Sequence, residues 1–168
     1  MMIAAFVSSF YLDVLKGNGP NSIPKSNLRR YGIALDRDSI EYQPIHDMLE
    51  FPRINYRRYN MKEYDYVYAA GIYSIGDLTN RLIKINVKNR DFTIWSEKGC
   101  HPGEPVFVPK PGSLQEDDGP ILSVVLDSNK ETSFLLTLNA QTFDEIARAE
   151  VPHHIPYGFH GQYYGGID

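Results

Sequence analysis

The sequence has little of what marks secreted or nucleic-acid-binding proteins. It has a single cysteine, Cys100, so no disulfide can form within the chain, and it has no Asn-x-Ser/Thr sequon. Both absences are typical of a reducing intracellular compartment. Lys and Arg total 17 against 21 Asp and Glu, a net charge of −4. Because this charge offers no basic field to a phosphate backbone, nucleic acid is not an expected partner.

The sequence also lacks an apolar run long enough to cross a bilayer. Its most apolar stretch, residues 1–11, has no basic residues before it and is soon followed by Asp13. This favours a buried strand over a membrane span, with a cleaved signal peptide as the alternative. We expect an intracellular protein, cytoplasmic or alternatively mitochondrial.

What the chain has in quantity is aromatic residues, with 12 Tyr and 8 Phe among 168 residues. They occur in short runs together with β-branched residues, which predicts strands. The expected strands are residues 64–71, 81–87, 91–96, 121–127, 132–139 and 145–151. Helical periodicity is weak, and residues 140–145 predict the one short helical turn. The fold class predicted from these patterns is all-β.

The strand pattern repeats along the chain. LIKINVKNRD, beginning at Leu82, aligns with LLTLNAQTFD, beginning at Leu135, at an offset of 53 residues; Glu50 and Glu104 align at an offset of 54. A third period ends close to His160. Repeats of this length with four strands each are typical of β-propeller blades. Two unrelated strand pairs that share common turn chemistry are the alternative.

If the repeats are blades, Glu50, Glu104 and His160 lie at or near successive innermost strands. Innermost strands of a propeller face its axis, so these side chains would converge on one central spot and could form a metal or substrate site. His160 lies in IPYGFHG, where Pro156 and the glycines restrict or shape the backbone. We expect this segment to aim the imidazole inward.

The other polar clusters have simpler interpretations. The acidic residues 116–118 lack the alternating spacing of a calcium loop and predict a solvated turn. The tyrosine run at residues 59–68 is explained by the alternating faces of a strand. We expect Cys100 to be structural, and His101, His153 and His154 to be exposed loop residues.

Four segments resemble the C-terminal part of the carotenoid cleavage oxygenases, with the animal branch of β-carotene oxygenases and the retinoid isomerohydrolase as the nearest match. They are EFPRINY (50–56), GEPVFVPKPGSLQEDDGPILSVVLD (103–127), LLTLNAQTFDEIARAEVP (135–152) and IPYGFHG (155–161). The resemblance is strong over residues 50–162 and weak over residues 1–49. It implies that residues 1–168 are a C-terminal fragment of the family's domain, namely the last two to three blades of a seven-bladed β-propeller.

The resemblance also implies a site. Members of the family hold one iron(II) on the propeller axis with four histidines, three of which hydrogen-bond to glutamates. His160 corresponds to the last iron ligand, Glu50 and Glu104 to two of the glutamates, and Phe159 to an aromatic residue of the substrate cavity. Imidazoles suit iron(II), and a glutamate on the other ring nitrogen fixes the tautomer of each ligand.

The implied reaction is oxidative cleavage of a polyene double bond by O2, giving two carbonyl products such as apocarotenoid or retinal aldehydes or ketones. Expected partners are a carotenoid or apocarotenoid and O2, with peripheral membrane association through parts absent here. The chain departs from the family in length and in its histidines. It offers only His160 of the four, because His46 lies in no matching motif. The alternative is therefore a catalytically incompetent, truncated paralogue or an incomplete gene product that acts at most in binding.

Overall fold

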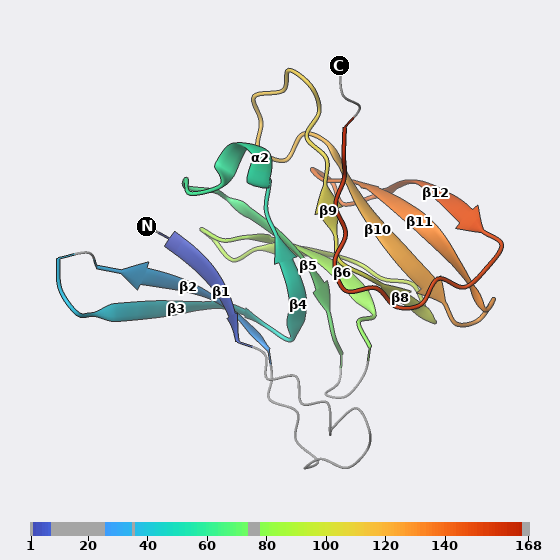
Figure 1. The fold of residues 1–168 in the computed structure, drawn as a ribbon, viewed down its shortest axis with the longest axis horizontal. Coiled ribbons are helices and arrows are strands. Elements are labelled where there is room, and N and C mark those ends of the chain that lie inside the picture. Colours follow the sequence, from blue (N-terminus) through green and yellow to red (C-terminus); the bar gives the residue numbers. More distant parts are fainter. Residues whose placement is uncertain (1, 8–25, 35, 74–77, 166–168) are drawn as a thin grey trace, which may run out of the picture.

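The chain forms three antiparallel sheets that follow one another in sequence (Figure 1). The computed structural model describes residues 2–7, 26–34, 36–73 and 78–165. In the described part the first sheet contains β1 (Met2–Val7), β2 (Asn27–Ile33) and β3 (Ile40–Asp47). The second sheet contains β4 (Leu49–Arg53), β5 (Tyr66–Gly71), β6 (Arg81–Asn86) and β7 (Phe92–Trp95). These elements confirm the predicted all-β class.

The third sheet has the order β12, β11, β10, β8, and β9 also pairs with β10. Its strands are β8 (Cys100–Pro102), β9 (Val106–Phe107), β10 (Pro120–Asp127), β11 (Thr132–Asn139) and β12 (Glu145–Val151). The edge next to β10 is thus divided into two short strands. Residues 103–105 interrupt it, and Pro105 contributes no backbone N–H to a ladder. Glu104 lies in this interruption.

The second sheet is buried on both faces because its neighbours cover it from either side. On one face, Tyr68, Ala70 and Leu82 join a core cluster with residues of the third sheet, including Phe107 and Leu136. On the other face, Val67, Ala69, Ile83 and Ile85 join a second cluster that also contains Leu28 of β2. A strand with two buried faces reads as a nearly continuous apolar run, and this explains YVYAAG in the sequence and also LIKI, whose one charged residue, Lys84, is buried and paired with Asp117.

The 53-residue repeat corresponds to two equivalent turns. After β6, the Asn86 side-chain oxygen accepts from the N–H groups of residues 88 and 89, and after β11 Asn139 does the same with residues 141 and 142. Each turn ends on a left-handed residue, Arg90 at φ 68° and Phe143 at φ 67°. The two strand pairs therefore share one turn geometry at the same place in successive sheets.

Two local predictions were only partly right. Residues 140–142 form the predicted turn, in which the Phe143 N–H donates to the Asn139 carbonyl oxygen at 2.7 Å, but the left-handed conformation of Phe143 ends it after one turn. The helix that does form is α2 (Tyr56–Tyr59), which follows β4. It takes in part of the tyrosine run, so strand alternation does not explain that run as a whole.

The acidic cluster is not a solvated turn either. The Glu116 carboxylate is partly buried and accepts from the backbone N–H groups of Asp65 at 2.8 and 3.0 Å and of Tyr66 at 2.9 Å. Asp117 contacts the buried Lys84 at 2.8 Å. This loop of the third sheet therefore binds the start of β5 and the middle of β6 in the second sheet.

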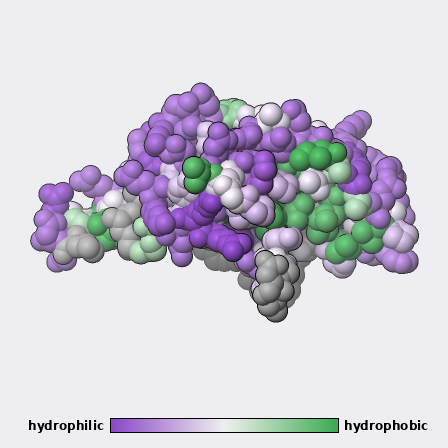
Figure 2. Space-filling view, turned by 90° about the horizontal axis from the view of Figure 1, so that it is seen from above, coloured by the Kyte–Doolittle hydropathy of each residue, from purple (hydrophilic) through white to green (hydrophobic). Residues whose placement is uncertain are grey.

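Hydrophobic residues are also exposed on one side of the third sheet. Val124 of β10 and Leu135 of β11 are exposed, as are Ile155 and Phe159 of the segment that follows β12. Figure 2 shows hydrophobic residues gathered over the right-hand part of the face it presents, where the third sheet lies. In the described residues no helix is both long and apolar enough to span a bilayer.

Candidate metal centre

The segment 152–165 carries His160 along the junction between the second and third sheets. It leaves β12, passes β8 and then runs beside β9 toward the C-terminus (Figure 1). It has no regular secondary structure from residue 154 to residue 165. Side chains of the two sheets therefore have to hold it in place.

The first of these attachments is at Ser133 of β11. The backbone N–H of Ile155 donates to the Ser133 hydroxyl oxygen at 2.8 Å, and that hydroxyl lies 3.4 Å from the Ile155 carbonyl oxygen. Ser133 is buried, so both of its hydrogen bonds are made with the segment and are shielded from water. The register of the segment is thereby fixed five residues before His160.

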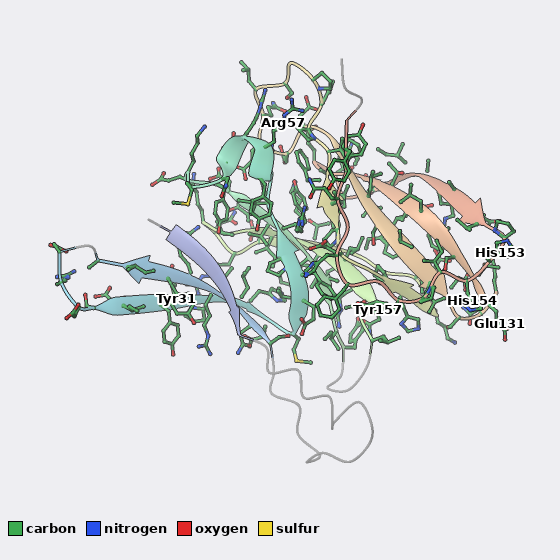
Figure 3. All side chains as sticks on the ribbon, viewed as in Figure 1. Tyr31, Arg57, Glu131, His153, His154 and Tyr157 are labelled. Atoms are coloured by element: carbon green, nitrogen blue, oxygen red, sulfur yellow. The ribbon has the colours of Figure 1, made fainter. Side chains whose placement is uncertain are left out.

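The second attachment is Tyr157. Its hydroxyl lies 2.7 Å from the Thr79 hydroxyl oxygen, which in turn donates to the carbonyl of Pro102. Because the Thr79 proton is used toward Pro102, Tyr157 is the donor to Thr79. Burial raises the pKa of Tyr157, and the nearby negative charge of Glu50 raises it further. Tyr157 thus stays neutral and can donate at physiological pH; Figure 3 labels it near the middle of the molecule.

The third attachment is the carboxylate of Glu104. Its Oε1 lies 3.1 Å from Nδ1 of His160, and its Oε2 accepts the Gly161 backbone N–H at 2.8 Å. Only 5% of the Glu104 side chain is exposed, whereas 67% of the His160 side chain is exposed. One carboxylate therefore binds the ring of His160 and the backbone after it, while the rest of the imidazole projects outward.

These contacts determine how the imidazole can be used. An ionised carboxylate can only accept hydrogen bonds, so the His160 proton belongs on Nδ1 and the lone pair on Nε2. Among the described residues Nε2 has no hydrogen-bond partner. An imidazole held in this way by a carboxylate is the arrangement usual for a metal ligand.

Aromatic rings surround the imidazole. Phe51 packs edge-on against Phe159 with ring centroids 5.3 Å apart, and against His160 at 5.8 Å. Phe51 has φ 53° within a break in the β4 register between Glu50 and Arg53. A left-handed phenylalanine is strained, and such strain is found mostly where a function requires it. Here it directs the ring toward the segment 159–160.

An apolar cavity opens beside His160. It has a volume of about 260 Å³ and is lined by residues of β10 and β11 on one side and of the C-terminal segment on the other. Leu122, Val124 and Leu135 supply its apolar wall, and Phe159, His160 and Glu104 lie at its other side. The cavity suits an apolar ligand that is placed by shape.

The structure brings some of the predicted residues together and leaves others apart. His160, Glu104 and Phe159 share one site, and Glu50 lies on β4 opposite Ala70, close enough for its charge to act on Tyr157. In the part of the chain that the structure describes, no three His, Cys, Asp or Glu side chains are grouped as metal ligands. At this site the described residues place one imidazole, that of His160.

The remaining histidines lie outside the site. His153 and His154 are exposed at the outer end of the third sheet, as predicted (Figure 3). His101 was expected to be an exposed loop residue, and this prediction was wrong. It lies in β8, and its Nδ1 is 3.1 Å from the Thr79 carbonyl oxygen. His46 packs edge-on against Phe92 with centroids 5.2 Å apart.

Cys100 is buried, and burial raises the pKa of its thiol to about 11, which fits a structural residue.

Sequence reasoning missed Arg53, Thr79 and Tyr157. Arg53 contacts both Glu104 and Gln162, and Thr79 joins Tyr157 to Pro102. These contacts join residues 23 to 109 positions apart. The only signal in the sequence is that Arg53 and Tyr157 lie inside the segments that carry the family resemblance.

Comparison with known proteins identifies the family. The model of the retinal pigment epithelial membrane protein family matches residues 2–165. The chain belongs to this family. The human mitochondrial carotenoid-cleaving dioxygenase is 48% identical over 117 residues, which cover 68% of this chain and 20% of the human protein. The chloroplastic carotenoid cleavage dioxygenase 8 of Arabidopsis thaliana is 35% identical over 158 residues, 89% of this chain and 27% of that protein.

Solved structures of the same family have the same fold. A variant of the Synechocystis apocarotenoid oxygenase superposes with a TM-score of 0.79 at 28% identity, covering 87% of this chain and 31% of that one. A cobalt-substituted form of the same enzyme gives 0.78 at 29% identity, with the same coverage. The predicted resemblance to carotenoid oxygenases and the predicted β-propeller fold are thereby confirmed. The chain spans less than a third of each of these relatives.

Proposed function

We propose that this chain is the C-terminal part of an iron(II)-dependent dioxygenase that cleaves a double bond of a carotenoid or apocarotenoid. The observation that carries the proposal is the hydrogen bond between Glu104 and Nδ1 of His160, which leaves Nε2 directed away from the carboxylate. Support for the reaction class comes from relatives that are named carotenoid-cleaving enzymes.

The residues present fit one ligand of a metal site. Neutral imidazole is a good ligand for iron(II), and a carboxylate on its second nitrogen increases its basicity and fixes the ring. His160 would bind through Nε2, with Glu104 behind it and Glu50 behind a further ligand. A relative of the same fold has been solved in a cobalt-substituted form, which supports a metal site in this fold. The other three histidines would come from blades that this chain does not span.

The cavity beside His160 would hold the polyene. A polyene has no hydrogen-bonding groups along its chain, so its position depends on apolar walls such as Leu122, Val124 and Phe159. When bound, iron(II) supplies open coordination positions for dioxygen. The net reaction breaks one C=C double bond and gives two C=O groups, one oxygen atom going to each product. We place the enzyme inside the cell, with mitochondria as one location because a relative is named mitochondrial.

The proposal is tested in a chimera in which residues 50–165 replace the corresponding residues of the human relative. We expect the purified chimera to contain about one iron per chain and to cleave a carotenoid into two carbonyl products, measured by metal analysis and by chromatography. The unaltered human protein is the control. A chimera that folds as the human protein does but contains no iron would contradict the proposal and favour the alternative of an incompetent paralogue.

A further inference from the structure

Arg53 connects three elements at the candidate metal centre. It ends β4, and its guanidinium reaches Glu104 Oε1 with Nη1 at 3.4 Å and the Gln162 side-chain oxygen with Nη2 at 3.3 Å. Its Cζ also lies 5.3 Å from the centre of the Tyr56 ring. About 20% of the Arg53 side chain is exposed, so most of it is removed from water.

The contacts of Arg53 and Glu104 hold His160 and the two residues that follow it. Oε1 of Glu104 faces both Arg53 and the His160 ring, Oε2 accepts from Gly161, and Arg53 then holds Gln162. Three donors on a carboxylate define its plane. A carboxylate with a fixed plane offers its lone pair to Nδ1 from one direction only, and this sets the rotation of the imidazole.

The arrangement is not what a purely stabilising ion pair requires. The Nε atom of Arg53 is buried and has no partner among the described residues, and a buried unpaired N–H costs free energy. Arg148 makes a useful contrast, because its Nε and both Nη atoms contact Glu97 and Glu145, at distances from 2.6 to 3.4 Å. The two hydrogen bonds that Arg53 makes go to the side chains of Glu104 and Gln162.

We propose that Arg53 is a positioning residue that fixes the Nδ1–H tautomer and the orientation of His160 by acting through Glu104 and Gln162. The inference rests on the proposed function, in which Nε2 of His160 is the metal-binding atom. A lysine could not replace it fully, because a single ammonium group lacks the planar fork that reaches two acceptors.

The test measures the tautomer of His160 in the metal-free chain. The ratio of the Nδ1–H to the Nε2–H form is read from long-range 1H–15N NMR of the labelled chain at about pH 8.5, well above the ordinary imidazole value of about 6.5. The His160→Ala spectrum identifies the ring signals of His160. We expect Arg53→Met to lower the ratio at least about twofold, the lower end of the coupling between residues in one network. Arg53→Lys should give an intermediate ratio.

Two variants make the result specific. Arg148→Met removes an arginine with ion pairs elsewhere and should leave the His160 ratio unchanged even if it lowers stability, whereas Glu104→Ala should lower the ratio. If Arg53→Met does not fold, two milder variants replace it. Gln162→Ala removes the contact of Arg53 with Gln162, and Arg53→Lys removes the planar group that reaches both Glu104 and Gln162. An unchanged ratio in the folded Arg53 variants overturns the inference, and so does an unchanged ratio in Glu104→Ala. Because no metal is present, the iron content of the chimera tests the proposed function independently.

Discussion

At the scale of single residues, the site depends on a buried carboxylate that holds an exposed imidazole. Glu104 lies between Gly103 and Pro105, where the edge of the third sheet is interrupted, and its carboxylate binds His160 and Gly161. A residue before proline is restricted to extended backbone, so the approach of the carboxylate is also restricted. The proposed ligand is therefore oriented before any metal arrives.

Replacing Glu104 by Ala should weaken metal binding in the chimera. The loss of a carboxylate behind a histidine ligand typically costs about ten- to a hundredfold in metal affinity. Competition with a chelator measures the change. Glu150→Ala, which removes an exposed carboxylate on β12, should have no effect. Equal affinities of the Glu104→Ala chimera and the unaltered chimera would refute the role of Glu104.

Replacing Tyr157 by Phe should lower stability modestly. The change removes the hydrogen bond to Thr79 and keeps the ring, so we expect a loss of about 0.5–1.5 kcal/mol in the free energy of unfolding, measured by chemical denaturation. Tyr163→Phe, on a half-exposed residue of the same segment, is the matched control. A loss no larger than that of the control would show that Tyr157 does not anchor the segment.

At the scale of elements, the two turns that follow β6 and β11 have equivalent geometry. We therefore expect the same substitution in either turn to lower the free energy of unfolding by a similar amount. Asn86→Ala and Asn139→Ala each remove two hydrogen bonds to backbone N–H groups. Each variant should lose about 0.5–2 kcal/mol, the range for a side chain that caps backbone donors. Thermal unfolding of both variants checks this. Losses in the free energy of unfolding that differ by more than about 1 kcal/mol would show that the two turns do not contribute equally to stability.

The strands were predictable from sequence where local pattern and burial agree. β11 and β12 have the predicted bounds. β5, β6 and β10 differ from theirs by one or two residues at one end, and β7 by one residue at each end. Helix α2 could not be predicted, because YRRY has no apolar period and Asn55 before it is held by the Glu116 carbonyl in the third sheet. The expected turn at 140–145 is present, but it stops after one turn because the burial of Phe143 in the core holds that residue in a left-handed conformation.

The site was predictable only in part. The family resemblance indicated His160, Glu104, Glu50 and Phe159, because those residues lie in long matching segments. Arg53 and Tyr157 act through partners 51 to 109 residues away, and no local pattern encodes such contacts. The same reason hid the role of Glu116, whose partners lie at the start of β5.

At the scale of the whole molecule, the loop that carries Glu116 joins the second and third sheets. Burial raises the pKa of Glu116 above its ordinary value of 4.5. A raised carboxyl pKa means that the folded state binds the proton more tightly than the unfolded state does. The contribution of Glu116 to stability is therefore present below about 4.5 and is lost as the pH rises through the folded-state pKa.

Glu116→Gln should remove this dependence on pH. The free energy of unfolding of the variant minus that of the unaltered chain should increase from about pH 4 to about pH 7. Chemical denaturation at each pH measures this difference. Glu150→Gln changes an exposed carboxylate and serves as the control. A Glu116→Gln variant whose stability difference is the same at both pH values would contradict the assignment.

The most direct test of the account is the iron content of the chimera with and without His160. We predict about one iron per chain in the unaltered chimera and in the chimera with His154→Ala, because His154 is exposed and lies outside the site. We predict almost none with His160→Ala, provided that the variant melts at a similar temperature. Full iron occupancy in a folded His160→Ala chimera would contradict the claim that this imidazole binds the metal.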